Sequence, residues 1–255
     1  MKKILNIIIS FIALISIWQL AVSLGNWNVS LFPSPLSVIQ CFKELIESGA
    51  LAAGIKDSLY RFAAGYCMAA LSGIILGLFL GWFRKFWSFV NPVVQLIRPI
   101  SPIAWLPFVV LWFGIGDLPA MVIIFIAAFF PILLTTISAV GKVDQTYIKV
   151  AKNFGLNQFQ TLTKIVLPSA FPFIATGLHL ALGTAWVFLV AGEMVGSQTG
   201  LGYMIIDARN NLRADLLLAS ILTIGIVGLI LDSLIGFAEK KILNLSGFVP
   251  NERGA

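Results

Sequence analysis

Ionisable side chains stand within apolar stretches of this sequence, where a charge is costly and therefore indicates a function, and we single out four of them. They are Arg98, His179, Glu193 and Asp232. His179 and Glu193 could be the acid and base of an intramembrane enzyme such as a transferase, with Asp232 beside them. They lie 14 residues apart on one expected helix, about 21 Å along its axis, which does not make a catalytic pair. A histidine hydrogen-bonded inside a helix bundle is the simpler interpretation, with Asp232 paired to a cation or facing water.

Other motifs for chemistry are missing from the sequence. It contains no Gly-x-x-x-x-Gly-Lys-Ser/Thr phosphate loop, no Gly-x-Ser-x-Gly and no His-Glu-x-x-His. Cys41 and Cys67 are isolated, without metal-ligand spacing or a disulfide framework. We therefore expect no catalytic residue, no bound cofactor and no metal on this chain.

Composition places the chain in a membrane. Of its 255 residues 59% are hydrophobic and 11% are charged, against about 25% charged in a typical soluble domain. The net charge is +6, and the basic residues stand in small groups between the apolar segments. This distribution favours a role in orienting the chain in a membrane over nucleic-acid binding. The sequence predicts an all-α integral membrane protein, a single transmembrane domain over residues 1–255.

We expect six spans, at about 4–24, 60–82, 89–113, 119–140, 171–195 and 216–237. The first is long enough to be a retained helix, although Ala21-Val22-Ser23 would also suit the cleavage site of a signal peptide. With both termini in the cytoplasm, eleven of the 17 Lys and Arg residues fall on the cytoplasmic side and five on the other, as the positive-inside rule requires. Residues 34–48 predict an amphipathic interfacial helix. We expect Asp117 to cap a helix that Pro119 opens, and residues 193–215 to form a polar loop.

The second span carries a small residue at every fourth position. Small residues on one face let another helix approach closely, and we expect this face to pack a helix. Its members are Gly65, Ala69, Gly73, Gly77 and Gly81.

The third span contains four prolines, which forbid a straight helix. Irregular backbone at membrane depth is tolerated only inside protein or beside a water-filled path. Arg98 could there contact an anion, or it could extend to the cytoplasmic boundary. We expect the translocation path to include Arg98, Pro99 and Pro102, with Glu193 from the fifth span.

Residues 141–169 are the long polar interruption of the chain. Asp144 can cap a helix over 145–153 that Gly155 ends in a left-handed conformation, and Asn157 can cap a second helix that stops at Pro168. Basic and apolar side chains stand together here. This combination favours contact with another protein, the alternative being two amphipathic helices on lipid headgroups.

The spacing of Ala151, Gly155, Ile165, Leu167 and Pro168 resembles the cytoplasmic coupling loop of permease subunits of binding-protein-dependent ABC importers. The family's loop usually opens with Glu-Ala-Ala, whereas this chain has Lys149 and Val150 in the first two places. The resemblance covers nearly the whole chain and is closest to the branch for nitrate, aliphatic sulfonates, taurine and bicarbonate. It assigns the contact with the ATPase to Lys149, Val150, Ala151, Lys152, Phe154, Gly155, Ile165, Leu167 and Pro168.

This resemblance implies the six-helix type I permease fold with a cytoplasmic coupling helix. It also implies partners: cytoplasmic ATPase subunits that hold ATP and Mg²⁺, an extracytoplasmic solute-binding protein, a second permease copy and the lipid of a bacterial inner membrane. The solute would be a small oxyanion, or else a thiamine precursor or riboflavin, which relatives also move. An intramembrane enzyme or a passive channel would leave the coupling loop without a purpose.

Overall fold

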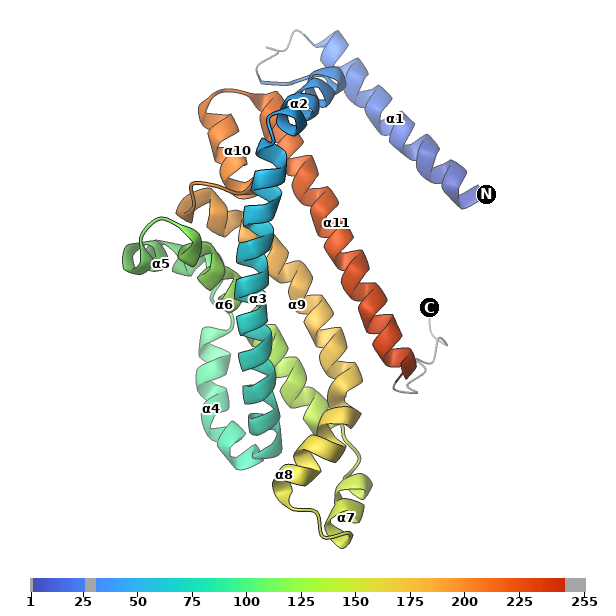
Figure 1. The fold of residues 1–255 in the computed structure, drawn as a ribbon, viewed down its shortest axis with the longest axis vertical. Helices are drawn as coiled ribbons and strands as arrows, with labels where there is room; N and C mark the ends of the chain where they lie inside the picture. Colours follow the sequence, from blue (N-terminus) through green and yellow to red (C-terminus); the bar gives the residue numbers. More distant parts are fainter. Residues whose placement is uncertain (1, 26–30, 246–255) are drawn as a thin grey trace. The chain divides into compact units, whose positions relative to one another are not determined.

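The computed structural model describes residues 2–25 and 31–245, and every regular element in these ranges is a helix (Figure 1). The chain divides into two compact units. The first comprises residues 1–58 and 198–227, and the second 59–197 and 228–255. Of the basic residues used to predict the topology, Arg253 lies outside the described residues, as does the C-terminus.

The first unit contains α1 (Lys2–Leu24), α2 (Pro35–Glu47), α10 (Leu201–Asn210) and the first parts of α3 (Ala50–Trp82) and α11 (Ala214–Leu245). The predicted amphipathic helix is α2, which begins where the Ser34 hydroxyl accepts a hydrogen bond from the Ser37 N–H at 3.2 Å. It buries one side chain per turn, and Val38, Cys41 and Leu45 pack with Ala219 of α11.

The expected polar loop over 193–215 is wrong, because it contains the helix α10. Gly200 turns the chain with a φ of 101°, and the helix starts at the next residue. The Leu201 N–H, which has no acceptor within its own helix, donates to the Ser58 hydroxyl at 2.9 Å. Leu201 and Ala208 are buried. These contacts are made far along the chain, so the local polarity of the segment did not indicate them.

The second unit holds the rest of α3 and α11, and the elements from α4 to α9. These are α4 (Arg84–Ile97), η1 (Pro102–Trp105), α5 (Leu106–Phe113), α6 (Asp117–Gly141), α7 (Gln145–Asn153), α8 (Gln158–Thr161), the π-helical turn η2 (Leu162–Val166) and α9 (Leu167–Gly196). Helix α4 turns back beside the end of α3, where the rings of Phe79 and Phe86 meet edge to face (Figure 1).

The third apolar segment is broken, as its prolines predict. Helix α4 ends at Ile97, and the chain resumes at Pro102 in a direction 81° away. Arg98 and Pro99 lie in the break and Pro102 opens η1, and the missing N–H groups of the two prolines prevent one continuous helix.

Helix α6 begins two residues earlier than expected, and Asp117 does not cap it. The N-cap is Gly116, with a φ of 153°, and Asp117 is the first helical residue. An aspartate here still lies at the positive end of the helix dipole. Its carboxylate instead accepts a hydrogen bond from the Arg61 Nε at 2.7 Å.

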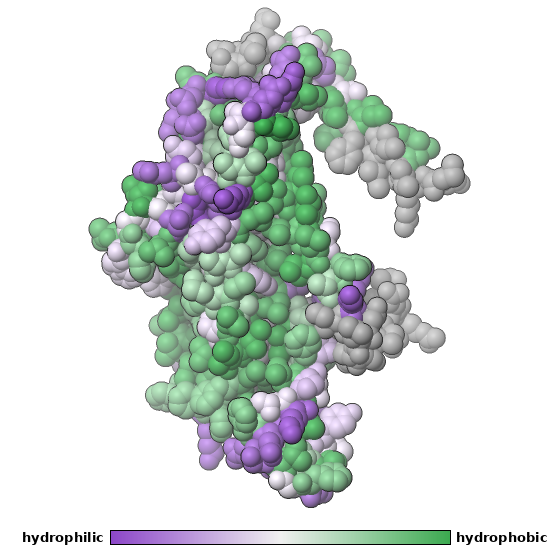
Figure 2. All heavy atoms as spheres, in the orientation of Figure 1, coloured by the Kyte–Doolittle hydropathy of each residue, from purple (hydrophilic) through white to green (hydrophobic). Residues whose placement is uncertain are grey.

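Four helices among the described residues are long and apolar enough to cross a membrane, or five if the bent pair of α4 with η1 and α5 counts as one span. The described apolar stretch of α1, Ile12–Leu24, is shorter. The count of six therefore stays a prediction. Figure 2 shows apolar surface over the helices of the second unit and polar residues gathered at its end with α7 and α8.

Glycine faces bring α3 and α9 close to α6. A Cβ atom added at Gly65, Gly73, Gly77 or Gly81 of α3 would lie 2.6–3.0 Å from atoms of α6, and Ala69 is fully buried. On α9, Gly192 and Gly196 approach Ala120 and Pro119 of α6 in the same way, and Gly177 approaches Thr135. The small residues predicted as a packing face thus lie against α6, which has a glycine-lined neighbour on two sides.

We expect Gly77→Leu to lower the free energy of unfolding by about 1–3 kcal/mol, because its Cβ would lie 2.6 Å from the Thr136 Cβ and force the helices apart. The measurement is thermal unfolding of the purified protein, with its yield in the membrane. Gly225→Leu is the matched control, since a Cβ at this helical glycine meets nothing within 4 Å. Equal stability of the two variants would show that the α3 face is not a packing face.

Candidate functional site

The segment from α7 to η2 begins with a helix whose two ends are both fixed locally. The Asp144 carboxylate accepts a hydrogen bond from the Thr146 N–H at 2.8 Å, which also lowers the pKa of Asp144 below its ordinary value. At the other end Gly155 has a φ of 75°. Its N–H bonds to the Lys152 carbonyl at 2.9 Å, and the next N–H bonds to the Ala151 carbonyl at 3.1 Å. This is a Schellman ending, so the predicted cap and stop of α7 are confirmed.

The second half of the segment continues into α9. Asn157 and Gln160 form a capping box, with hydrogen bonds of 2.8 and 3.0 Å, which confirms Asn157 as a cap. The expectation that this helix stops at Pro168 is wrong. One residue before it the Leu167 N–H reaches back to the Leu162 carbonyl, five residues earlier. This wider turn accommodates the proline, which has no N–H to donate, at the start of α9.

The expected coupling residues divide between the two faces of this segment. Ala151 is buried, and Ile165 and Leu167 are half-buried. The exposed members are Lys149, Val150, Lys152, Phe154, Gly155 and Pro168. Phe154 is 79% exposed and the nearby Phe159 74%. Two phenylalanines this exposed beside lysines form a surface suited to a protein partner.

A second feature is a cavity of about 390 Å³ beside the break in the third segment. Arg98 and Pro102 line it, together with Phe130, Thr184 and Phe188 among others. Arg98 is exposed and forms no ion pair or side-chain hydrogen bond with the residues that the structure describes. An unpaired guanidinium among aromatic and hydroxyl groups can bind an anion.

Pro99 and Glu193, which we expected on the same path, do not line this cavity. Pro99 lies exposed in the break. Glu193 is 0% exposed and meets the Arg61 guanidinium, with Nη1 and Oε1 2.7 Å apart. Arg61 is itself 3% exposed, and its Nε donates to Asp117 at 2.7 Å. A buried carboxylate needs such a cationic partner.

Sequence reasoning missed this Arg61–Asp117–Glu193 network, although a signal was present. In the predicted topology α3 and α6 start at the same end of the bundle where α9 finishes. Arg61 lies early in α3, Asp117 opens α6 and Glu193 is near the end of α9. The position of each residue along its predicted span would have placed the three charges at the same depth in the membrane. Their opposite signs would then have predicted an ion pair.

The histidine of this chain is held between two carboxylates of α11. Nδ1 of His179 lies 2.6 Å from Oε2 of Glu239, and Nε2 lies 3.0 Å from Oδ1 of Asp232. The Thr176 hydroxyl donates to Oε1 of Glu239 at 2.7 Å. Because ionised carboxylates only accept, an imidazolium satisfies both contacts at once. The expected hydrogen-bonded His179 is confirmed, and its partners join α9 to α11.

Comparisons with known proteins agree with these features. Residues 73–244 match the family model described as "Binding-protein-dependent transport system inner membrane component". A Bacillus subtilis (strain 168) protein named for aliphatic sulfonates transport is 34% identical over 230 residues, 90% of this chain and 83% of that protein. A nitrate import permease protein of Leptolyngbya laminosa is 35% identical over 92% of this chain and 86% of its own length.

Solved structures share the fold. An inward-facing methionine ABC transporter, MetNI, contains a chain that superimposes with a TM-score of 0.67 at 22% identity. The match covers 78% of this chain and 97% of that one.

We expect Arg61→Gln to cost about 3–5 kcal/mol of stability, because it leaves the Glu193 carboxylate buried without its cation. Thermal unfolding of the purified permease measures this loss. The double variant Arg61→Gln with Glu193→Gln removes the buried charge as well, and it should recover a large part of the loss. A double variant no more stable than Arg61→Gln would show that the ion pair is not what the site requires.

Proposed function

The chain belongs to the family of binding-protein-dependent transport system inner membrane components and is a permease subunit of an ABC importer, and we propose that the solute it moves is a small oxyanion. Nitrate, an aliphatic sulfonate, taurine and bicarbonate are the candidates. The observation that carries the choice is the cavity at Arg98, an unpaired cation beside the break in the third segment. The names of the two relatives, sulfonates and nitrate, agree with an anion.

The Arg98 cavity suits a small anion by its lining as well as its charge. Its other polar members are Thr135 and Thr184, whose hydroxyls donate to the Pro131 and Leu180 carbonyls at 2.8 and 3.3 Å and would have to turn from them to donate to an oxyanion. No carboxylate lines the cavity among the described residues, because Glu193 is held by Arg61 elsewhere. We therefore assign Arg98 and Pro102 to the translocation path.

The proposal includes the assembly. Family membership implies an ATPase and a solute-binding protein as partners, so ATP and Mg²⁺ are bound outside this chain. We place the ATPase contact on α7 and α8, where Phe154 and Phe159 stand exposed beside Lys149 and Lys152. Two copies of the chain form the path in the inner membrane, with both termini in the cytoplasm. ATP-driven closure then moves α7 and α8, and with them the broken segment that lines the path.

Coupling is tested at Gly155. We expect Gly155→Val to lose solute uptake and to weaken co-purification of the ATPase, because a β-branched residue at a φ of 75° is strained by roughly 1 kcal/mol or more and tilts α7. A Cβ there meets nothing within 4 Å, so the backbone angle alone decides the effect. Gly155→Asn is the control, since asparagine tolerates this angle. Normal uptake by Gly155→Val would remove α7 from the coupling role.

The solute class is tested at Arg98. Cells carrying Arg98→Gln should take up labelled nitrate, taurine, an alkanesulfonate or bicarbonate at least about tenfold more slowly, while ATPase binding is unchanged. Arg98→Lys should recover part of the rate, because a point charge cannot reproduce a planar fork. Lys240→Gln, an exposed charge away from the cavity, is the control. Normal uptake by Arg98→Gln, or uptake of a thiamine precursor or riboflavin alone, would overturn the oxyanion proposal.

A further inference from the structure

Two neighbouring cavities of different chemistry share one side chain at the end of the second unit that carries α7 and α8. The first has a volume of about 680 Å³ and the second about 450 Å³. Trp82, the last residue of α3, lines both of them. Tryptophan is the residue that membrane proteins place between headgroups and acyl chains.

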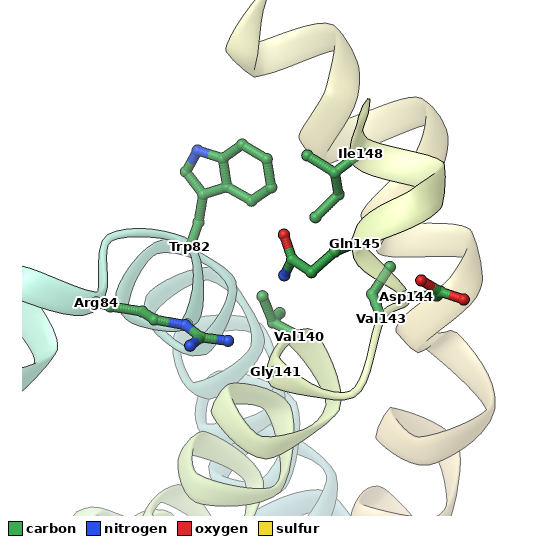
Figure 3. A pocket seen from close by; sticks show the side chains of 9 residues that line it. Trp82, Arg84, Val140, Gly141, Val143, Asp144, Gln145 and Ile148 are labelled. Carbon is green, nitrogen blue, oxygen red and sulfur yellow. The ribbon is translucent and has the colours of Figure 1, made fainter. Parts of the chain in front are cut away.

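The larger cavity is lined in part by polar side chains, among them Arg84 and Gln145. Figure 3 shows Trp82 and Arg84 on one side of it, facing Gln145 and Ile148 of α7. Asp144 also lines the cavity, and its carboxylate is directed away from Arg84. Arg84 is exposed and makes no ion pair or side-chain hydrogen bond within the described part of the chain. The cavity therefore offers a free guanidinium and an amide to an anionic group.

The smaller cavity is a groove lined chiefly by carbon. It lies between the end of α3 and the segment α8–η2, and Gln158 and Thr163 are its polar members. Its apolar lining includes Ile75, Leu78, Phe79, Phe83, Leu162 and Leu167. Ile75 is 64% exposed, so the groove is open along the surface of α3 that carries the apolar span.

We propose that these two cavities form one site for an anionic phospholipid, whose phosphate lies at Arg84 and whose acyl chain lies in the groove beyond Trp82. A ligand that fills both must carry a negative charge at one end and a long apolar chain at the other. Basic pockets between membrane helices are known to hold such headgroups. An acidic side chain of a protein partner would meet Arg84 but leave the groove empty.

The site would join the membrane surface to α7. Gln145 and Ile148 line the headgroup cavity, and both belong to the helix whose exposed side carries Lys149 and Lys152. By helical spacing Lys149 and Lys152 share this face of α7, and Phe159 lines the groove, so a lipid bound there lies beside the proposed ATPase surface. We place this lipid in the cytoplasmic leaflet, and only this placement rests on the proposed function, which puts α7 and α8 at the cytoplasmic end.

The test uses the intact transporter complex in mild detergent, titrated with dioleoyl phosphatidylglycerol or dioleoyl phosphatidylcholine and followed by native mass spectrometry. We expect phosphatidylglycerol to bind at one tight site per permease copy. Arg84→Gln should weaken that binding about fivefold, the contribution of one basic residue near a membrane surface. Lys85→Gln is the matched control, because Lys85 is the next residue and is exposed but lines neither cavity.

The groove has its own arm of the test. Ile75→Trp fills part of it, and should weaken binding of the dioleoyl lipid more than that of a short-chain phosphatidylglycerol. Equal loss in Arg84→Gln and Lys85→Gln would mean surface attraction without a site. Displacement of the lipid by inorganic phosphate at matched concentration would mean an anion pocket without a lipid. Either result overturns the proposal. Uptake by the Arg98 and Gly155 variants is read separately, so failure here leaves the transport function standing.

Discussion

Close approach to α6 is the constraint on which the second unit depends. In a bilayer, apolar helices gain little by leaving lipid for one another, so association rests on van der Waals contact and polar bonds. The glycines of α3 face α6 from Gly65 to Gly81, and those of α9 approach it at Gly177, Gly192 and Gly196. The side chains they admit are the buried ones of α6, among them Ile124, Ile132 and Thr136. With α3 and α9 both held against α6, Arg61, Asp117 and Glu193 come within bonding distance.

Local signals in the sequence predicted what local physics determines. The prediction of α7 was correct at both ends because Asp144 and Gly155 act on their own neighbours, Asp144 through a side-chain cap and Gly155 through a left-handed backbone conformation. The break after Ile97 followed from prolines that cannot donate a hydrogen bond. The packing face of α3 was visible as a repeat of small residues, although the sequence did not name α6 as its partner.

Contacts between distant segments were not predictable in this way. Helix α10 is held by Ser58, which lies 143 residues before its partner Leu201, and no pattern within 193–215 indicates that bond. Glu193 was expected on the path because a carboxylate within an apolar helix is costly and therefore indicates a function. Its partner Arg61, however, is 132 residues away in the sequence. Asp117 is a good cap by type, but the ion pair with Arg61 takes its carboxylate. In each case a tertiary partner decided between two roles that the residue type allowed.

The two ends of the segment between α6 and α9 are buried in the same hydrophobic cluster. Val143, just before α7, and Val166, at the end of η2, are buried in one cluster with Ala139, Ala170 and Ile174. A push on α7 or α8 is therefore delivered to the ends of α6 and α9 together, and not to a loose loop. From α8 the helical backbone continues through the π turn η2 to Gly196, over 39 residues or about 58 Å at the α-helical rise. At that far end the Gly196 carbonyl accepts from the Gly116 N–H at 2.7 Å, beside the residues paired with Arg61. Because Gly177, Gly192 and Gly196 of α9 pack closely on α6, the two helices have little room to slide past each other over that part of their length. Under the proposed coupling role, we expect these two helices to shift as one body, and the broken segment, which packs on them through Leu106 and Val109, to move with them.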